Sequence, residues 1–335
     1  METSQIGFPI DFVITWVDQL DPKWQRKYKK HKGIQEDEIL RYRDYGTLKY
    51  LFRSIEKFAP WVNHIFLVTD EQIPEWLNTD CKKLTVVDHK EIIPLKYLPT
   101  FNSNVIDFHL KNIPNLAEHF VYFNDDTYLN SLTTPEDFFS KDGRVKDSFA
   151  YNILMPSPNP GDTFDHIYVN NLQVLNKEFP KYKIQKEHMG KIFNYKNGLW
   201  NLMSLFLLPL PRYSRFYDPH IPLSFRLSVI NSFIAKHPYI EKMFSNRTRE
   251  NSDFSIWLIR YFELLQGNFS PRSIKFGKRY SLENVNDAIR DIQLHKHKLI
   301  CINDADVSDD QFRLLIKQLN LAFQKELFKK CSFEK

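Results

Sequence analysis

Residues 120–129 read Phe-Val-Tyr-Phe-Asn-Asp-Asp-Thr-Tyr-Leu, and no other stretch of the chain says as much about its fold. The first four of these residues form a short apolar run of the kind that a strand buried on both faces presents. The run ends at Asn124, where the carboxylates of Asp125 and Asp126 follow the strand. Ligands of open α/β sheets bind outside the carboxyl ends of the strands. The stretch therefore predicts a buried strand with an acidic ligand site at its end.

The two adjacent carboxylates, Asp125 and Asp126, point to a bound cation. Neighbouring side chains on a strand face opposite ways, so only one of the two need face the site. If both faced it without a cation, like charges ~4 Å apart would cost roughly 4 kcal/mol at an effective dielectric constant of 20. A plain turn is the simpler interpretation of an isolated Asn-Asp-Asp. The rest of the chain shifts the balance toward a ligand site.

Strand-like and helix-like segments alternate upstream of this stretch. Residues 10–17, 65–69 and 84–87 are β-branched and apolar runs that predict buried strands, each followed by an aspartate. Residues 48–58 carry apolar side chains at helical spacing. This alternation predicts an α/β fold with a mostly parallel sheet flanked by helices. The aspartate after the first strand, Asp18, could contact a nucleotide or cap the next helix, and the sequence leaves both open.

The second half of the chain is expected to be mostly helical. Residues 150–215 follow a looser pattern around a proline-rich loop, and we interpret them as a helical insertion or lid that forms one wall of the site. The insertion would belong to a single catalytic domain that spans residues 1–335. Further helices are predicted at 169–179, 191–208, 225–234, 254–265 and 312–328, and a short helical turn is predicted in the first half of the chain at 73–78.

The composition excludes several classes of protein. The chain has only 9 glycines and neither GxxxxGK[ST] nor GxGxxG, so side chains, a metal or helix N-termini must hold any phosphate. A net charge of +5 suits an anionic substrate or membrane surface but is too diffuse to indicate nucleic acid. Three widely spaced cysteines indicate reduced thiols in a cytoplasmic protein. No stretch resembles a signal peptide or is long enough to span a bilayer.

Further candidate site residues lie on three stretches away from the acidic pair. Asp107 is on an early turn of a helix expected just upstream of residue 120. His220 stands between two prolines, which limit its backbone. Arg247, Arg249 and Asp253 precede a strongly apolar helix. They could cap that helix, or the arginines could form a fork on a phosphate at its N-terminus.

Together these pieces resemble the Stealth family of sugar-1-phosphate transferases. This family includes bacterial capsular and exopolysaccharide phosphotransferases and the catalytic subunit of the animal lysosomal-enzyme GlcNAc-1-phosphotransferase. The resemblance implies a nucleotide-sugar-transferase-like (Rossmann-like) fold, a UDP-sugar donor and a divalent cation. Four blocks match. The first covers residues 10–18, the third 220–222 and 249–253, and the fourth 301–304. The second is the longest and most specific, and it covers residues 43–62, 65–78, 98–103 and 122–126.

By this resemblance the active-site acids of the family fall on Asp107 and Asp126, its histidine on His220 and its arginine on Arg249. This chain has Asp107 where the animal members carry Glu. Phosphoryl-type transfer needs neutralised phosphate charge, an in-line nucleophile and a base. Arg249 would clamp the phosphate that bears the sugar. Either His220 or Asp107 would take the proton from the acceptor hydroxyl, and the sequence leaves this open.

The remaining roles concern the cation and the donor. Oxygen ligands suit Mg²⁺ or Mn²⁺. Expected metal ligands are Asp125, Asp126 and Asp253, and expected donor contacts are Asp18, Arg43 and Arg247.

The expected reaction moves a hexose 1-phosphate (such as GlcNAc-1-P, Gal-1-P or GalNAc-1-P) from a UDP-sugar to a hydroxyl of a polysaccharide or lipid-linked oligosaccharide and releases UMP. One alternative is an ordinary glycosyltransferase on the same fold, which releases UDP. Another is a non-catalytic carbohydrate-binding partner of a capsule machine. Contact of the basic stretch 23–32 with the inner face of the cytoplasmic membrane stays open, although such a stretch is more often a solvated face. Homo-oligomerisation stays open too.

Overall fold

The computed structural model describes residues 6–32, 42–158 and 162–335. Its centre is a five-stranded sheet in which the first four strands are parallel and the last is antiparallel to its neighbour. This arrangement confirms the predicted α/β class with a mostly parallel sheet. The strands in spatial order are β3 (Leu84–Asp88), β2 (Ile65–Thr69), β1 (Ile10–Thr15), β4 (His119–Asn124) and β9 (Leu223–Arg226).

The apolar runs of the sequence became the interior strands because both of their faces are covered. Residues 10–14 of β1 and 120–123 of β4 are all buried. A strand buried on both faces has no solvent side, so its sequence shows no alternation. Strand β3 lies at the edge of the sheet and is less completely covered, with Leu84 and Val87 buried and Thr85 exposed.

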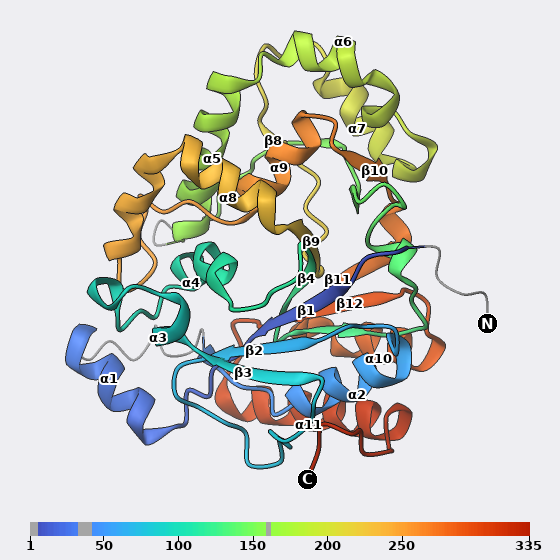
Figure 1. Ribbon diagram of the computed structural model, residues 1–335. Coiled ribbons are helices and arrows are strands. Elements are labelled where there is room, and N and C mark those ends of the chain that lie inside the picture. The colour runs from blue at the N-terminus through green and yellow to red at the C-terminus, as the bar shows by residue number, and fades with distance from the viewer. Residues whose placement is uncertain (1–5, 33–41, 159–161) are drawn as a thin grey trace.

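Helices cover both sides of this sheet (Figure 1). Helices α2, α10 and α11 lie on one side, and α4, α8 and α9 lie on the other. The helices are α1 (Pro22–Lys32), α2 (Leu48–Phe58), α3 (His89–Ile92), α4 (Ser103–His109), α5 (Thr163–Glu178), α6 (Lys181–Ile192), α7 (Trp200–Leu207), α8 (Leu227–Lys236), α9 (Trp257–Leu265), α10 (Val285–Leu294) and α11 (Asp309–Glu326).

A second, three-stranded sheet brings the C-terminal third of the chain to the end of β4. Strand β5 (Thr127–Leu129) starts after a two-residue turn formed by Asp125 and Asp126. Strand β12 (Leu299–Asn303) pairs antiparallel with β5, and β11 (Gly277–Ser281) pairs parallel with β12. The acidic turn therefore lies between the two sheets.

The segment between residues 150 and 215 is a helical excursion from the sheet region. Strand β7 (Tyr151–Asn152) pairs antiparallel with β8 (Arg215–Phe216), so the excursion begins and ends at the same place. Helices α5, α6 and α7 lie between these strands, and α5 packs against α9. The remaining short pair is β6 (Val145–Asp147) with β10 (Phe269–Pro271). The role of the excursion as a lid stays a prediction.

Several of the predicted helices differ from the structure. Helix α5 begins at residue 163 instead of 169, and α9 begins at residue 257 instead of 254. Residues 73–78 form an irregular turn, where Leu77 bridges to Glu334. The helix expected at 191–208 is interrupted between residues 193 and 199, where Gly198 adopts a φ of 54°. The helix expected at 225–234 begins only at residue 227, because Phe225 pairs with Phe120 in the sheet. In that case tertiary pairing overrode the local helical spacing.

Within the described residues, the longest apolar helices fall short of what crossing a membrane requires.

Candidate active site

A small cavity of about 40 Å³ lies at the carboxyl end of β4. Two of the predicted catalytic residues, Asp107 and His220, line it from opposite halves of the chain. The other lining residues are Tyr122, Asn124, Thr127, Ile221, Pro222, Leu223, Ile256 and Trp257. The position agrees with the rule that parallel sheets bind ligands beyond their carboxyl ends.

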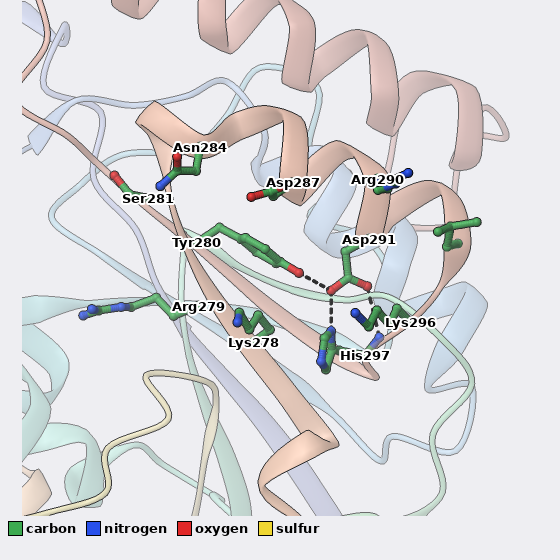
Figure 2. Close-up of a pocket in the computed structure, with 11 residues that line it drawn as sticks. Lys278, Arg279, Tyr280, Ser281, Asn284, Asp287, Arg290, Asp291, Lys296 and His297 are labelled. Atoms are coloured by element: carbon green, nitrogen blue, oxygen red, sulfur yellow. Dashed lines mark hydrogen bonds and ion pairs between the residues drawn. The ribbon is translucent and has the colours of Figure 1, made fainter. Parts of the chain in front are cut away.

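A larger cleft of about 730 Å³ lies between β11 and α10 (Figure 2). Its centre is Asp291, whose carboxylate accepts hydrogen bonds from the Tyr280 hydroxyl at 2.7 Å and the His297 backbone N–H at 3.0 Å, and lies 2.5 Å from His297 Nδ1. The Asn130 amide also donates to Asp291, at 3.0 Å. The Asp291 carboxylate is therefore fully engaged, the other acid of this cleft, Asp287, is exposed to solvent, and no predicted catalytic residue lines the cleft. The smaller cavity is therefore the better candidate for the chemistry.

Asp126 meets two residues that are distant in the sequence. Ligand atoms of Asp126, His220 and Cys301 all lie within 4.8 Å of one another. The Cys301 thiol points at Asp126 Oδ2 over 3.4 Å and at Asn303 Oδ1 over 2.8 Å. Desolvation raises the pKa of Asp126 to about 6. Burial, and next the charge of Asp126, raise the pKa of the Cys301 thiol well above its usual range, so the thiol is protonated at neutral pH.

His220 is held in place by a buried arginine of helix α9. Its φ of 50° lies in the left-handed region, which costs a residue with a Cβ roughly 1–2 kcal/mol. Arg260 fixes the preceding loop by donating to Asp218 Oδ1 and to the Tyr217 carbonyl, both at 3.1 Å. Arg260 is itself anchored to Asp147 at 2.6 Å. The imidazole is therefore placed by the fold before any ligand arrives.

Three arginines surround this imidazole. Desolvation and then the charges of Arg279, Arg249 and Arg215 lower the pKa of His220 to about 4, so the ring is neutral at pH 7. Arg279 is directly opposite Cys301 in the β11–β12 pair, and paired residues share a face of a sheet. Guanidinium groups gathered in this way suit a diphosphate. Sequence reasoning missed Arg215 and Arg279, because each lies on a short strand without a motif.

Asp107 lies on α4 and is buried at the floor of the cavity. The Tyr122 hydroxyl donates a hydrogen bond of 2.7 Å to Asp107 Oδ1. Burial raises the pKa of Asp107 to about 7, against the opposing effects of the Tyr122 hydrogen bond and the Arg249 charge. Arg249 is next to the start of α4, where it donates to Ser103 Oγ at 2.8 Å. A carboxyl group that titrates near neutral pH is suited to act as a general base.

More acids gather at the same edge of the sheet. Burial, followed by the charges of Asp126 and Asp44, raises the pKa of Asp125 well above its ordinary value. Burial and then the charge of Asp18 raise the pKa of Asp44. Arg43 is bound to Asp309 at 3.0 Å, and its charge opposes the rise that burial causes in the pKa of Asp304. Asp18 and Arg43 thus lie at the acidic edge, and their donor contacts stay predictions.

The donor groups at this edge fit a hard divalent cation. Among the described residues, the buried Oδ1 atom of Asp126 has no hydrogen-bond partner. The neighbouring carboxylates repel one another, and a bound cation would relieve that repulsion. Mg²⁺ and Mn²⁺ prefer oxygen ligands to sulfur, and the Cys301 thiol is protonated. Asp125 and Asp126 are therefore the residues that fit such an ion.

Arg247 and Asp253, also expected to bind donor or metal, lie away from this cluster. The Asp253 carboxylate accepts hydrogen bonds of 2.7 Å from the amides of Asn102 and Asn246. Arg247 donates to the Pro99 carbonyl at 2.8 Å. These contacts bind the loop that carries Arg249 to the start of α4. We therefore leave Asp253 out of the metal set and assign both residues to positioning.

We expect Asp253→Ala to lower the free energy of unfolding by about 3 kcal/mol, because it removes a buried carboxylate that accepts hydrogen bonds from the Asn102 and Asn246 amides. Urea unfolding measures the loss. Asp253→Asn, which retains one carbonyl acceptor, should lose less. If Asp253 were instead a metal ligand, the difference in stability would depend on added Mg²⁺. If a chelator leaves the difference in the free energy of unfolding between parent and variant unchanged, the positioning role is supported.

Comparison with known proteins agrees with this geometry. Residues 8–34 match the model of Stealth conserved region 1, and residues 41–147 match that of conserved region 2. The chain is 47% identical over 330 residues to the exopolysaccharide phosphotransferase cps2G of Lactiplantibacillus plantarum, covering 98% of this chain and 97% of that protein. It belongs to the Stealth family.

Further relatives come from streptococci. The capsular polysaccharide phosphotransferase WcwK of Streptococcus pneumoniae is 38% identical over 335 residues, which cover 97% of this chain and 98% of the relative. The receptor polysaccharide phosphotransferase WefC of Streptococcus oralis is 37% identical over 312 residues, covering 90% and 92%. The similarity to these Stealth proteins therefore extends over both sheets and the helical excursion.

Proposed function

We propose that this Stealth protein transfers a hexose 1-phosphate from a UDP-sugar to a hydroxyl of a cell-surface polysaccharide and releases UMP. The relatives that it matches along nearly its whole length are named polysaccharide phosphotransferases. The single observation that carries the proposal is the meeting of an acid, an imidazole and an arginine from three separate segments. Asp107 and His220 line one cavity, and the charge of Arg249 acts on both.

The proposed roles follow from the charge of each group at neutral pH. Arg249, Arg279 and Arg215 bind the two phosphates of the donor. Asp107 takes the proton from the acceptor hydroxyl, because its pKa of about 7 matches the working pH and that of His220, about 4, is too low. His220 stays neutral and orients the phosphate. A cation held by Asp125 and Asp126 would neutralise charge on the phosphate oxygens.

The bond changes are those of a substitution at phosphorus. The acceptor oxygen forms a bond to the phosphorus next to the sugar as its proton passes to Asp107. The bond from that phosphorus to the oxygen bridging the two phosphates breaks. UMP leaves with this oxygen, and the sugar remains linked to the acceptor through a phosphodiester. The bond between the sugar and its phosphate stays intact throughout.

The test is a panel of UDP-sugars incubated with Mg²⁺ and an oligosaccharide acceptor, with nucleotide products measured by mass spectrometry. We expect UMP together with an acceptor heavier by one hexose phosphate. Release of UDP with an acceptor heavier by one hexose would instead establish the glycosyltransferase alternative. Saccharide binding without any nucleotide product would favour the non-catalytic alternative.

A further inference from the structure

Helix α7 carries its apolar side chains on the outside. Leu202, Leu205 and Phe206 are 55%, 55% and 77% exposed. The polar Ser204 faces inward, where its hydroxyl accepts a hydrogen bond of 2.9 Å from the Tyr151 backbone. Helices that are apolar around their whole circumference are ordinarily buried in a core or in a membrane. Among the described residues, nothing buries the outward half of α7.

The exposed apolar side chains extend beyond α7 into the flanking turns and onto α6. Isolated exposed apolar residues are common on protein surfaces, whereas a gathered set marks an interaction site. We call this set the apolar surface, and its members are Tyr182, Tyr195, Leu199, Leu202, Met203, Leu205, Phe206 and Leu210.

The apolar surface is held rigidly rather than on a loose loop. The buried ammonium group of Lys181 on α6 donates to the carbonyls of Leu207 and Leu210 at the C-terminal end of α7. A cation there also complements the helix dipole. The Gln185 amide donates to the Leu208 carbonyl at 3.0 Å. Helices α6 and α7 therefore form one unit, at the end of the molecule farthest from β2 and β3 (Figure 1).

The segment that bears this surface also holds the positive charge of the chain. Residues 177–215 contain eight Lys or Arg and two Glu, a net charge of +6. The whole chain has a net charge of +5, so everything outside this segment sums to −1. Lys183, Lys186 and Arg212 are exposed beside the apolar side chains. Exposed leucine and phenylalanine flanked by cations are the features of a helix that lies in the plane of an anionic bilayer.

We propose that the apolar surface docks this protein on an anionic lipid bilayer, with α7 lying in the interface. A second copy of the chain fits poorly, because a symmetric contact would bring two sets of the exposed cations Lys183, Lys186 and Arg212 together. A glycan fits poorly too, since leucine side chains offer it no hydrogen bonds.

The basic helix α1 has weaker features for this role than α7. Its two aromatic residues, Trp24 and Tyr28, turn inward and pack against Phe101. The cations of α1 are therefore not accompanied by exposed apolar side chains on the same helix that could insert into a membrane. The proposal assigns bilayer contact to α7 instead.

Sedimentation with lipid vesicles tests the proposal on the full chain. Vesicles of phosphatidylcholine mixed with phosphatidylglycerol are compared with pure phosphatidylcholine. We expect binding to the anionic vesicles that weakens at high salt. The variant Leu205→Gln/Phe206→Gln should bind at least tenfold more weakly, and Lys183→Gln/Lys186→Gln several-fold more weakly. The matched control is Leu314→Gln/Leu321→Gln on α11, where the leucines are 57% and 58% exposed, and it should bind as the parent does.

The outcomes separate the alternatives. Because the altered side chains are exposed, all variants should keep the melting temperature of the parent, which confirms that they fold. Equal binding by the parent and the α7 variant would overturn the proposal. So would a parent dimer, seen by light scattering without lipid, that the α7 variant converts to monomer. The assay contains no donor or acceptor, so its result is independent of the proposed reaction.

Discussion

Asp126→Asn is expected to reduce kcat/KM by about 10³-fold or more while the protein stays folded. The Asp126 carboxylate lies beside His220 and Cys301, and its buried Oδ1 atom has no hydrogen-bond partner among the described residues. Losing one positioned group that stabilises transition-state charge commonly costs 10²–10³ in kcat. A lost cation would add to this, because the phosphate charge would no longer be neutralised.

Cation binding provides a readout that does not depend on turnover. The free Mn²⁺ signal in electron paramagnetic resonance should fall on titration with the parent protein, and Asp126→Asn should bind Mn²⁺ at least tenfold more weakly. Asp310→Asn is the matched control, because Asp310 is 98% exposed on α11, and it should change neither quantity. Full turnover of the parent in strong chelator would contradict the proposed metal dependence.

Asp107→Asn is expected to abolish proton transfer and, at alkaline pH, to stabilise the fold. The activity of the parent should rise with pH up to about 7, as the buried carboxyl group loses its proton. The asparagine variant should lose this acid limb together with most of kcat. An amide is nearly isosteric with the acid and can still accept the Tyr122 hydrogen bond, so the loss would not come from packing.

The effect on stability has a definite sign. In the folded protein Asp107 keeps its proton up to about pH 7, whereas its ordinary pKa is 3.8. The folded state therefore binds more protons between these values, and the free energy of unfolding falls as pH rises through that window. Asp107→Asn removes this fall. The variant should match the parent near pH 4 and exceed it at pH 8 by up to about 4 kcal/mol.

Urea unfolding at the two pH values measures this difference, and Tyr122→Phe serves as the companion variant. The Tyr122 hydroxyl favours the ionised form of Asp107, so its loss should move the acid limb of the activity profile to higher pH. A profile that Asp107→Asn leaves unchanged would show that another group is the base. His220→Gln would then be the variant to measure, because His220 lines the same cavity and is the alternative base.

The sequence by itself determined the parts of the fold that depend on local burial. Strand 65–69 and helix 48–58 have the predicted bounds, because each apolar pattern reports which faces of that segment are covered. The buried run at 120–123 and the acidic turn after it follow the same logic. The position of the site at the carboxyl edge also followed, since parallel strands place their ends together.

Only the tertiary structure decided which residues meet and what each one does. Arg279 and Cys301 reach the site because β11 and β12 pair next to the acidic turn, and no local pattern encodes that pairing. Asp253 was a predicted metal ligand, and the structure shows that both of its oxygens accept hydrogen bonds from amides, which is why we propose a positioning role for it. The sequence placed helix α7 in a helical insertion, and only the fold shows that its apolar side chains are exposed. Local patterns report which faces of a segment are covered. Site chemistry depends instead on contacts between segments that are far apart in the chain.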